Sequence, residues 1–113
     1  MARRATLLQG TLDLLILKAL SARALHGLGV SRRVEQITGG TFVVQPGSLF
    51  PALHRLEEAG WLTADWQPSE NNRRAKYYSL TAPGRARLAQ GTRDWEVQSA
   101  AIARILHASM GEL

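Results

Sequence analysis

The chain has 113 residues, which suits one domain with a modest core, and its 14 Lys and Arg against 9 Asp and Glu give a formal charge of +5. It has no cysteine, which excludes disulfides, cysteine-based zinc sites and thiol catalysis and makes the cytoplasm the expected compartment. The basic balance favours a polyanionic partner, because cationic side chains that bind phosphates release counterions.

The first predicted helix spans residues 11–22 and is apolar on nearly every face. Such a helix must be covered on both sides, whereas the core of one small domain covers only one. The sequence therefore predicts that another element or a second subunit covers the other side. A membrane span is not expected, because Asp13 and Lys18 interrupt the apolar run and it falls short of the ~20 residues that a span needs. Residues 25–27 break the pattern and are predicted as a turn.

A second helix is predicted through Val30, Val34 and Ile37, whose spacings of four and three place them on one face. It ends at the glycine pair 39–40, since glycine suits the left-handed position past a helix end. A short extended run follows, and Pro46 favours an extended residue before it.

A third helix is predicted with Ser48 as its N-cap and Pro51 in its first turn, where proline has no intrahelical donor to lose. Gly60 ends this helix. The positions i, i+4 and i+7 of its buried stripe are Leu49, Leu53 and Leu56. The side chains that remain outward are Ser48, Phe50 or Pro51, His54, Arg55 and Glu58.

A β-hairpin is predicted after the third helix. Residues 61–66 and 76–80 alternate in hydropathy like two strands, and residues 67–74 between them are rich in Ser, Asn and Pro. The hairpin therefore has a long polar tip that ends in basic residues. Trp61 and Trp66 are expected to pack in the core, where large aromatic rings bury most area.

Thr81 is predicted to cap a final helix that has Pro83 near its start. A terminal helix with a wide apolar face must dock on its own domain or on a partner chain. The residues of that face, at spacings of seven, seven and four, are Leu88, Trp95, Ile102 and Leu106.

This order of elements is mainly α with a small β-hairpin and predicts a winged helix-turn-helix domain. The chain resembles the PadR-type transcriptional regulators, in their short form with a single C-terminal helix. The segments that carry the resemblance are GTLDLLIL, LHGLGVSRRVEQ, GSLFPALHRLEEAGWL and NNRRAKYYSLTAPGR. Phe50 departs from the tyrosine usual in the family. The expected organisation is a winged-helix DNA-binding domain over residues 1–81 and a C-terminal dimerisation helix over residues 82–113, forming one structural unit.

The residues expected to contact DNA lie on the third helix and the hairpin. Arg73 and Arg74 are the strongest candidates for phosphate or minor-groove contacts. Arg55 has a guanidinium group, which can bind guanine through two hydrogen bonds. The full set is Ser48, Phe50, Pro51, His54, Arg55, Asn72, Arg73, Arg74 and Lys76.

Ordinary structural roles remain open for several of these residues. Ser48 at a helix N-terminus suits a phosphate oxygen but equally caps the helix. Arg55 has Glu57 and Glu58 nearby as ion-pair partners, and the hairpin tip has the composition of a solvated turn. An Arg3-Arg4 arm that touches the DNA backbone competes with a frayed basic terminus.

A homodimer is expected from the apolar surplus of the first and last helices. Trp95 is expected in the dimer interface or the core, and the resemblance also implies a possible contact with a small hydrophobic effector. The expected interface residues are Leu12, Leu15, Leu88, Trp95, Ile102 and Leu106.

The function expected from these features is sequence-specific binding of double-stranded DNA by a homodimeric transcriptional repressor at a pseudo-palindromic operator. The alternative is a winged-helix protein-interaction module that binds no DNA. No enzyme activity, metal or cofactor is expected, because His26, His54 and His107 are far apart in sequence and lack metal-ligand spacing.

Overall fold

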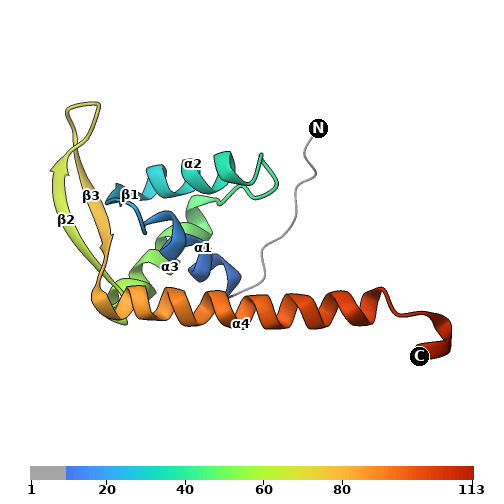
Figure 1. Ribbon diagram of the computed structural model, residues 1–113. Coiled ribbons are helices and arrows are strands. Elements are labelled where there is room, and N and C mark those ends of the chain that lie inside the picture. Colours follow the sequence, from blue (N-terminus) through green and yellow to red (C-terminus); the bar gives the residue numbers. More distant parts are fainter. Residues whose placement is uncertain (1–9) are drawn as a thin grey trace.

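The structure is a computed structural model that describes residues 10–113. Three helices pack together beside a small sheet, and a long C-terminal helix runs beneath them and extends beyond the rest of the domain (Figure 1). This is the winged helix-turn-helix architecture that the sequence predicts. In chain order the elements are α1 (Thr11–Ala19), β1 (Leu25–His26), α2 (Gly27–Ile37), α3 (Pro46–Glu58), β2 (Leu62–Pro68), β3 (Arg74–Leu80), α4 (Ala82–Leu106) and the short 3₁₀ helix η1 (Met110–Glu112).

The core lies between α1, α2, α3 and the base of the hairpin. The predicted stripe of α3 is confirmed, because Leu49, Leu53 and Leu56 are all buried. The predicted face of α2 holds at Val30 and Val34 but is wrong at Ile37, which is 74% exposed in the last turn, where the helix runs past the core. The other buried apolar side chains are Ile16, Leu17, Leu20, Val44, Ala52, Leu62 and Tyr78.

α3 begins three residues earlier than predicted. Gln45 is its N-cap with extended backbone (φ −79°, ψ 151°), and Pro46 takes the first helical position, where no intrahelical donor is needed. Ser48 is therefore the third residue of the helix, and its prediction as N-cap is wrong. Pro51 consequently falls inside the helix rather than in its first turn, so the Gly47 carbonyl has no N–H at position 51 to accept from.

α3 ends at Gly60 as predicted. Gly60 adopts a left-handed conformation (φ 82°), which a side chain would strain. The amide of Trp61 donates to the Leu56 carbonyl at 3.0 Å, and the amide of Gly60 donates to the Glu57 carbonyl at 3.0 Å. This pair of bonds is the Schellman arrangement, and it turns the chain directly into the hairpin.

The sheet of the described residues is antiparallel, with strand order β1-β3-β2. β1 is only two residues long and pairs Leu25 with Tyr78 and His26 with Tyr77, so the turn predicted for residues 25–27 is wrong. β2 and β3 pair from Leu62 opposite Leu80 to Pro68 opposite Arg74. The strands are therefore longer, and the tip shorter, than the sequence predicts.

The hairpin is a wing that leaves the core after its first residues. Leu62 is buried at its base, whereas Trp66, four residues further along β2, is 59% exposed. The prediction that Trp66 packs in the core is wrong, because the distal half of β2 extends past the helices that would cover it. Trp61 does pack against the core, with the Arg87 guanidinium 5.3 Å from its ring centroid.

α4 is anchored at its start and exposed beyond its middle. The Thr81 hydroxyl accepts from the Gly84 amide at 3.0 Å, which confirms the predicted cap, and donates to the Gly60 carbonyl at 2.6 Å. Leu88 packs against the core, whereas Ile102 and Leu106 are 52% and 74% exposed. No helix among residues 10–113 is long and apolar enough to cross a membrane.

Gly84 allows α4 to lie directly on the turn before the wing. A β-carbon built on Gly84 stands 2.0 Å from the Trp61 carbonyl oxygen, so Gly84→Ala must displace the helix or the turn. We expect a loss of about 2 kcal/mol in the free energy of unfolding, the cost of overpacking. Urea unfolding at one protein concentration measures it. Gly47→Ala is the matched control, because its β-carbon meets nothing within 4 Å and adds helix propensity. Equal stabilities of the two variants would contradict the close approach.

Candidate nucleic-acid interface

The outward face of α3 is exposed along its whole length. The outward residues predicted from the sequence all lie on this face or its flanks: Ser48, Phe50, Pro51, His54 and Arg55. At 100° per residue, Pro51 and His54 lie opposite the buried leucines, Arg55 lies on the flank toward α1, and Phe50 lies on the flank toward the wing.

Arg55 and His54, two candidates of α3, both have acidic partners. Arg55 Nη2 donates to Asp13 Oδ1 of α1 at 2.7 Å, so its partner is neither Glu57 nor Glu58, the ion-pair alternatives that the sequence left open. His54 and Glu58 pair one turn apart on the helix surface. In each pair at least one of the two side chains is exposed to solvent, so the interaction is weak and a phosphate can replace the acidic partner.

The wing tip carries two arginines of the predicted set. Arg73 and Arg74 are exposed, and neither makes an ion pair within residues 10–113. The turn is closed by the Ser69 amide, which donates to the Arg73 carbonyl at 2.7 Å. Asn72 adopts a left-handed conformation (φ 59°), which asparagine tolerates better than most residues, so Asn72 shapes the turn that presents the arginines.

Lys76 lies nearer the base of the wing and connects it to α3. Its Nζ donates to Glu57 Oε1 at 2.9 Å and lies 5.5 Å from the centroid of the Tyr78 ring. The hydrogen bond to Glu57 raises the pKa of Lys76 above its ordinary value. Lys76 therefore links the wing to α3.

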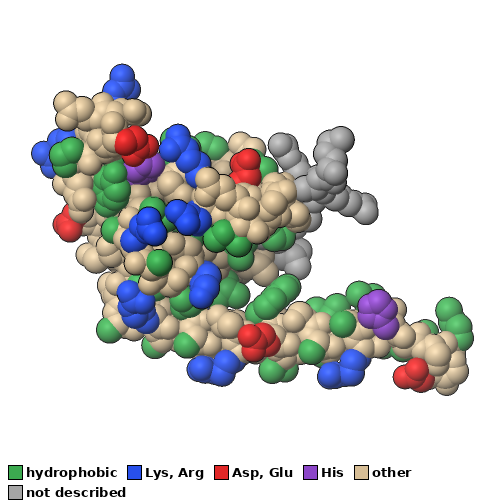
Figure 2. All heavy atoms as spheres, turned by 45° about the horizontal axis from the view of Figure 1, so that its top comes forward, with side chains coloured by type: hydrophobic (Ala, Val, Ile, Leu, Met, Phe, Trp, Pro, Cys, Tyr) green, Lys and Arg blue, Asp and Glu red, His purple; other side chains and the backbone are tan. Residues whose placement is uncertain are grey.

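A groove of about 350 Å³ separates the wing from the helices. Phe50 lies in its wall, with its ring so close to Gly27 that an added β-carbon there would stand 2.7 Å from Phe50 Cε1. Figure 2 shows Lys and Arg side chains on the wing and on the adjoining helices in one view. The basic side chains that line the groove are Arg32, Arg73, Arg74 and Lys76.

A cluster of three interacting side chains in this groove, His26, Arg32 and Glu70, is absent from the predicted site. His26 is the N-cap of α2, where its Nδ1 accepts from the Gly29 amide at 3.0 Å. Glu70 at the wing tip contacts both His26 and Arg32. The pKa of the Glu70 carboxyl is lowered, first by a hydrogen bond from its own backbone amide and second by His26. The sequence signal was weak, because Glu70 lies 38 positions from Arg32 and 44 from His26 along the chain.

The predicted dimer residues fall into two groups. Those close to the domain pack partly against its core: Leu12, Leu15 and Leu88. Those further along α4 are exposed: Trp95, Ile102 and Leu106. Trp95 and Ile102 also line a hollow of about 400 Å³ between α4 and α1. The Arg3-Arg4 arm lies outside the described residues.

No three His, Cys, Asp or Glu side chains within residues 10–113 lie close enough to hold a metal ion. The candidate site is a surface formed by the exposed face of α3, the basic wing and the groove between them.

Comparison with known proteins identifies this arrangement. The model of the transcriptional regulator PadR-like family matches residues 16–90. A transcriptional regulator of Mycobacterium tuberculosis is 32% identical over 81 residues, covering 72% of each chain. A transcriptional regulator from Clostridium thermocellum is 26% identical in sequence and superposes with a TM-score of 0.78, over 85% of this chain and 93% of that one. A PadR-like transcriptional regulator from Bacillus cereus is 26% identical in sequence and superposes with a TM-score of 0.76, over 89% of this chain and 96% of that one. The chain therefore belongs to the PadR-like family of transcriptional regulators.

Proposed function

We propose that the protein is a sequence-specific repressor that binds double-stranded DNA as a homodimer. The observation that carries this proposal is the pair Arg73 and Arg74, exposed at the tip of the wing and lining a groove that Phe50 of α3 also lines. In winged-helix docking the third helix enters the major groove and the wing reaches the flanking backbone. α3 then offers Ser48, Phe50, Pro51, His54 and Arg55 to the base edges and phosphates, while the wing offers Asn72, Arg73, Arg74 and Lys76.

α4 is the proposed dimerisation element, within residues 82–113. Its distal half carries Trp95, Ile102 and Leu106 on a surface that its own domain leaves exposed. A second copy of the helix is the natural cover for this surface, because it presents the same apolar residues. A two-fold dimer then places two α3 helices on half-sites about one helical turn, ~34 Å, apart on a pseudo-palindromic operator.

Trp95 is also the proposed contact for a small hydrophobic effector. It borders the hollow of about 400 Å³ whose apolar wall includes Leu14, Leu17 and Trp61. A flat apolar molecule in this hollow lies between α1 and α4. Its binding would alter the angle of α4 and hence the spacing of the two α3 helices.

Salt dependence of duplex binding tests the proposed function. A dimer that makes about six phosphate contacts loses roughly 10³-fold in affinity between 50 and 200 mM salt. Fluorescence anisotropy with duplexes selected from a random library measures both the affinity and the slope. Absence of duplex binding at low salt would contradict the proposal and favour the alternative, a protein-interaction module that uses the same surface.

A further inference from the structure

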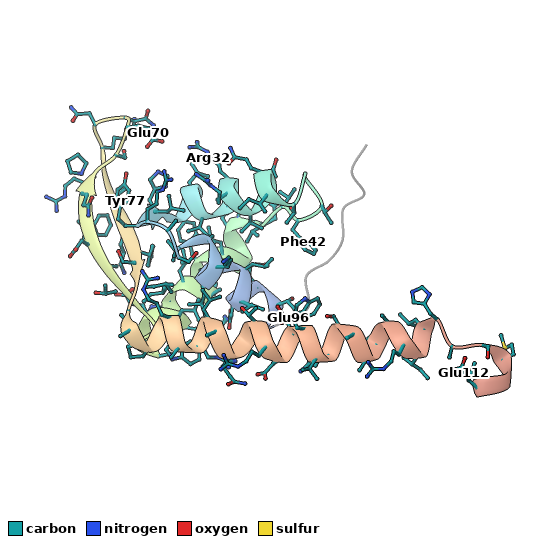
Figure 3. The ribbon with its side chains drawn as sticks, in the orientation of Figure 1. Arg32, Phe42, Glu70, Tyr77, Glu96 and Glu112 are labelled. Atoms are coloured by element: carbon teal, nitrogen blue, oxygen red, sulfur yellow. The ribbon has the colours of Figure 1, made fainter. Side chains whose placement is uncertain are left out.

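Glu70 stands at the tip of a largely basic wing, and its side chain reaches toward α2 (Figure 3). Its Oε1 lies 3.5 Å from Arg32 Nη1, and its Oε2 lies 3.5 Å from His26 Nε2. Each carboxylate oxygen therefore has its own nitrogen partner across the groove. The contact joins the wing tip to α2 at two points, the N-cap His26 and the sixth helical residue Arg32.

The partners of Glu70 are oriented as donors. His26 Nδ1 already accepts from the Gly29 amide at 3.0 Å, so a neutral imidazole carries its proton on Nε2, which is the nitrogen that faces Glu70. Arg32 has donors only. α2 begins at Gly27, directly after His26, and the start of a helix is the positive end of its dipole.

Arg32 and His26 together form a site for an oxyanion, and the carboxylate of Glu70 occupies that site in this structure. In helix-turn-helix docking the helix before the recognition helix lies against the DNA backbone, whose phosphates are oxyanions of the same charge. Arginine side chains and helix N-termini are common donors to phosphates in protein–DNA complexes, and an imidazole N–H donates to the same kind of oxygen.

We propose that Arg32 and His26 bind a backbone phosphate of the duplex, and that Glu70 occupies their site in the free protein. This inference rests on the proposed DNA binding. Formation of the complex exchanges the Glu70 carboxylate for a phosphate. Glu70 therefore acts as a built-in competitor that lowers the affinity for any duplex, whatever its sequence.

The experiment compares two substitutions that each remove one negative charge. Glu70→Gln keeps the shape of the side chain but removes the competing charge, while Glu96→Gln makes the same change on α4, far from the wing (Figure 3). Affinity for one mixed-sequence duplex is measured at a fixed salt concentration, because phosphate contacts do not depend on sequence. We expect Glu70→Gln to bind about three- to fivefold more tightly, the scale of an exposed ion pair, and Glu96→Gln to bind like the wild-type chain.

An Arg32→Gln background completes the test. There the gain from Glu70→Gln should disappear, because the anion site has lost its cation. Equal tightening by Glu70→Gln and Glu96→Gln would reduce the effect to net charge and overturn the inference. So would a gain that survives Arg32→Gln. A wild-type chain that binds duplex without any gain from Glu70→Gln refutes this inference alone, whereas a chain that binds no duplex refutes the proposed function and this inference with it.

Discussion

A chain carrying Arg73→Ala and Arg74→Ala is expected to bind duplex DNA roughly 60-fold more weakly per engaged protomer at 0.1 M salt, if each arginine holds one phosphate. The same loss should make the plot of log affinity against log salt shallower by about 2 per protomer. Both arginines are exposed at the end of the β2–β3 ladder, so their removal leaves the core intact. Anisotropy titrations at several salt concentrations measure the affinity and the slope together.

The matched control removes two arginines from α4. Arg93 and Arg104 are exposed on the long helix, and Arg93→Ala with Arg104→Ala lowers the net charge by the same amount. If the wing arginines act by direct phosphate contact, the control keeps nearly the full salt slope. A slope that falls equally in both variants would mean that binding responds only to overall charge, and the wing would lose its proposed role.

The sequence correctly predicted those features of the candidate DNA interface that are determined within a single helix or at its ends. The spacing of Leu49, Leu53 and Leu56 sets which face of α3 is buried, and therefore which face is outward. Gly60 and Thr81 mark the helix boundaries on either side of the wing, because each satisfies backbone groups within a few residues. These features are determined by neighbouring residues and are therefore readable from the sequence.

Features that depend on distant contacts were missed or misjudged. Trp66 has a large aromatic side chain of the kind that is usually buried, but it is exposed because β2 runs past the helices that would cover it. Arg55 has two glutamates close in sequence and pairs instead with Asp13, 42 residues away. The contact of Glu70 with Arg32 spans 38 residues. Only the packed fold brings such partners together, so propensity and spacing do not reveal them.

The double variant Trp95→Glu with Ile102→Glu is expected to dissociate the proposed dimer. Both residues lie seven positions apart on one face of α4 and are about half exposed within the protomer. A carboxylate at each position would be buried against the same apolar face of the second copy, without a cation to pair with. We expect a loss of about 4 kcal/mol in dimer stability, roughly 1,000-fold in the dissociation constant.

Sedimentation velocity distinguishes an interface on this face from one elsewhere on α4. Val97 is 71% exposed and lies about 200° around the helix from Trp95, so Val97→Glu makes the same kind of change on the opposite face and should remain a dimer. A chain truncated after Arg87 should sediment as a monomer, because it lacks the exposed part of α4. A dimer that persists in this truncated chain would exclude α4 as the interface. The monomeric double variant should also bind an operator far more weakly than the wild-type chain, since two α3 helices joined in one dimer engage both half-sites in a single event.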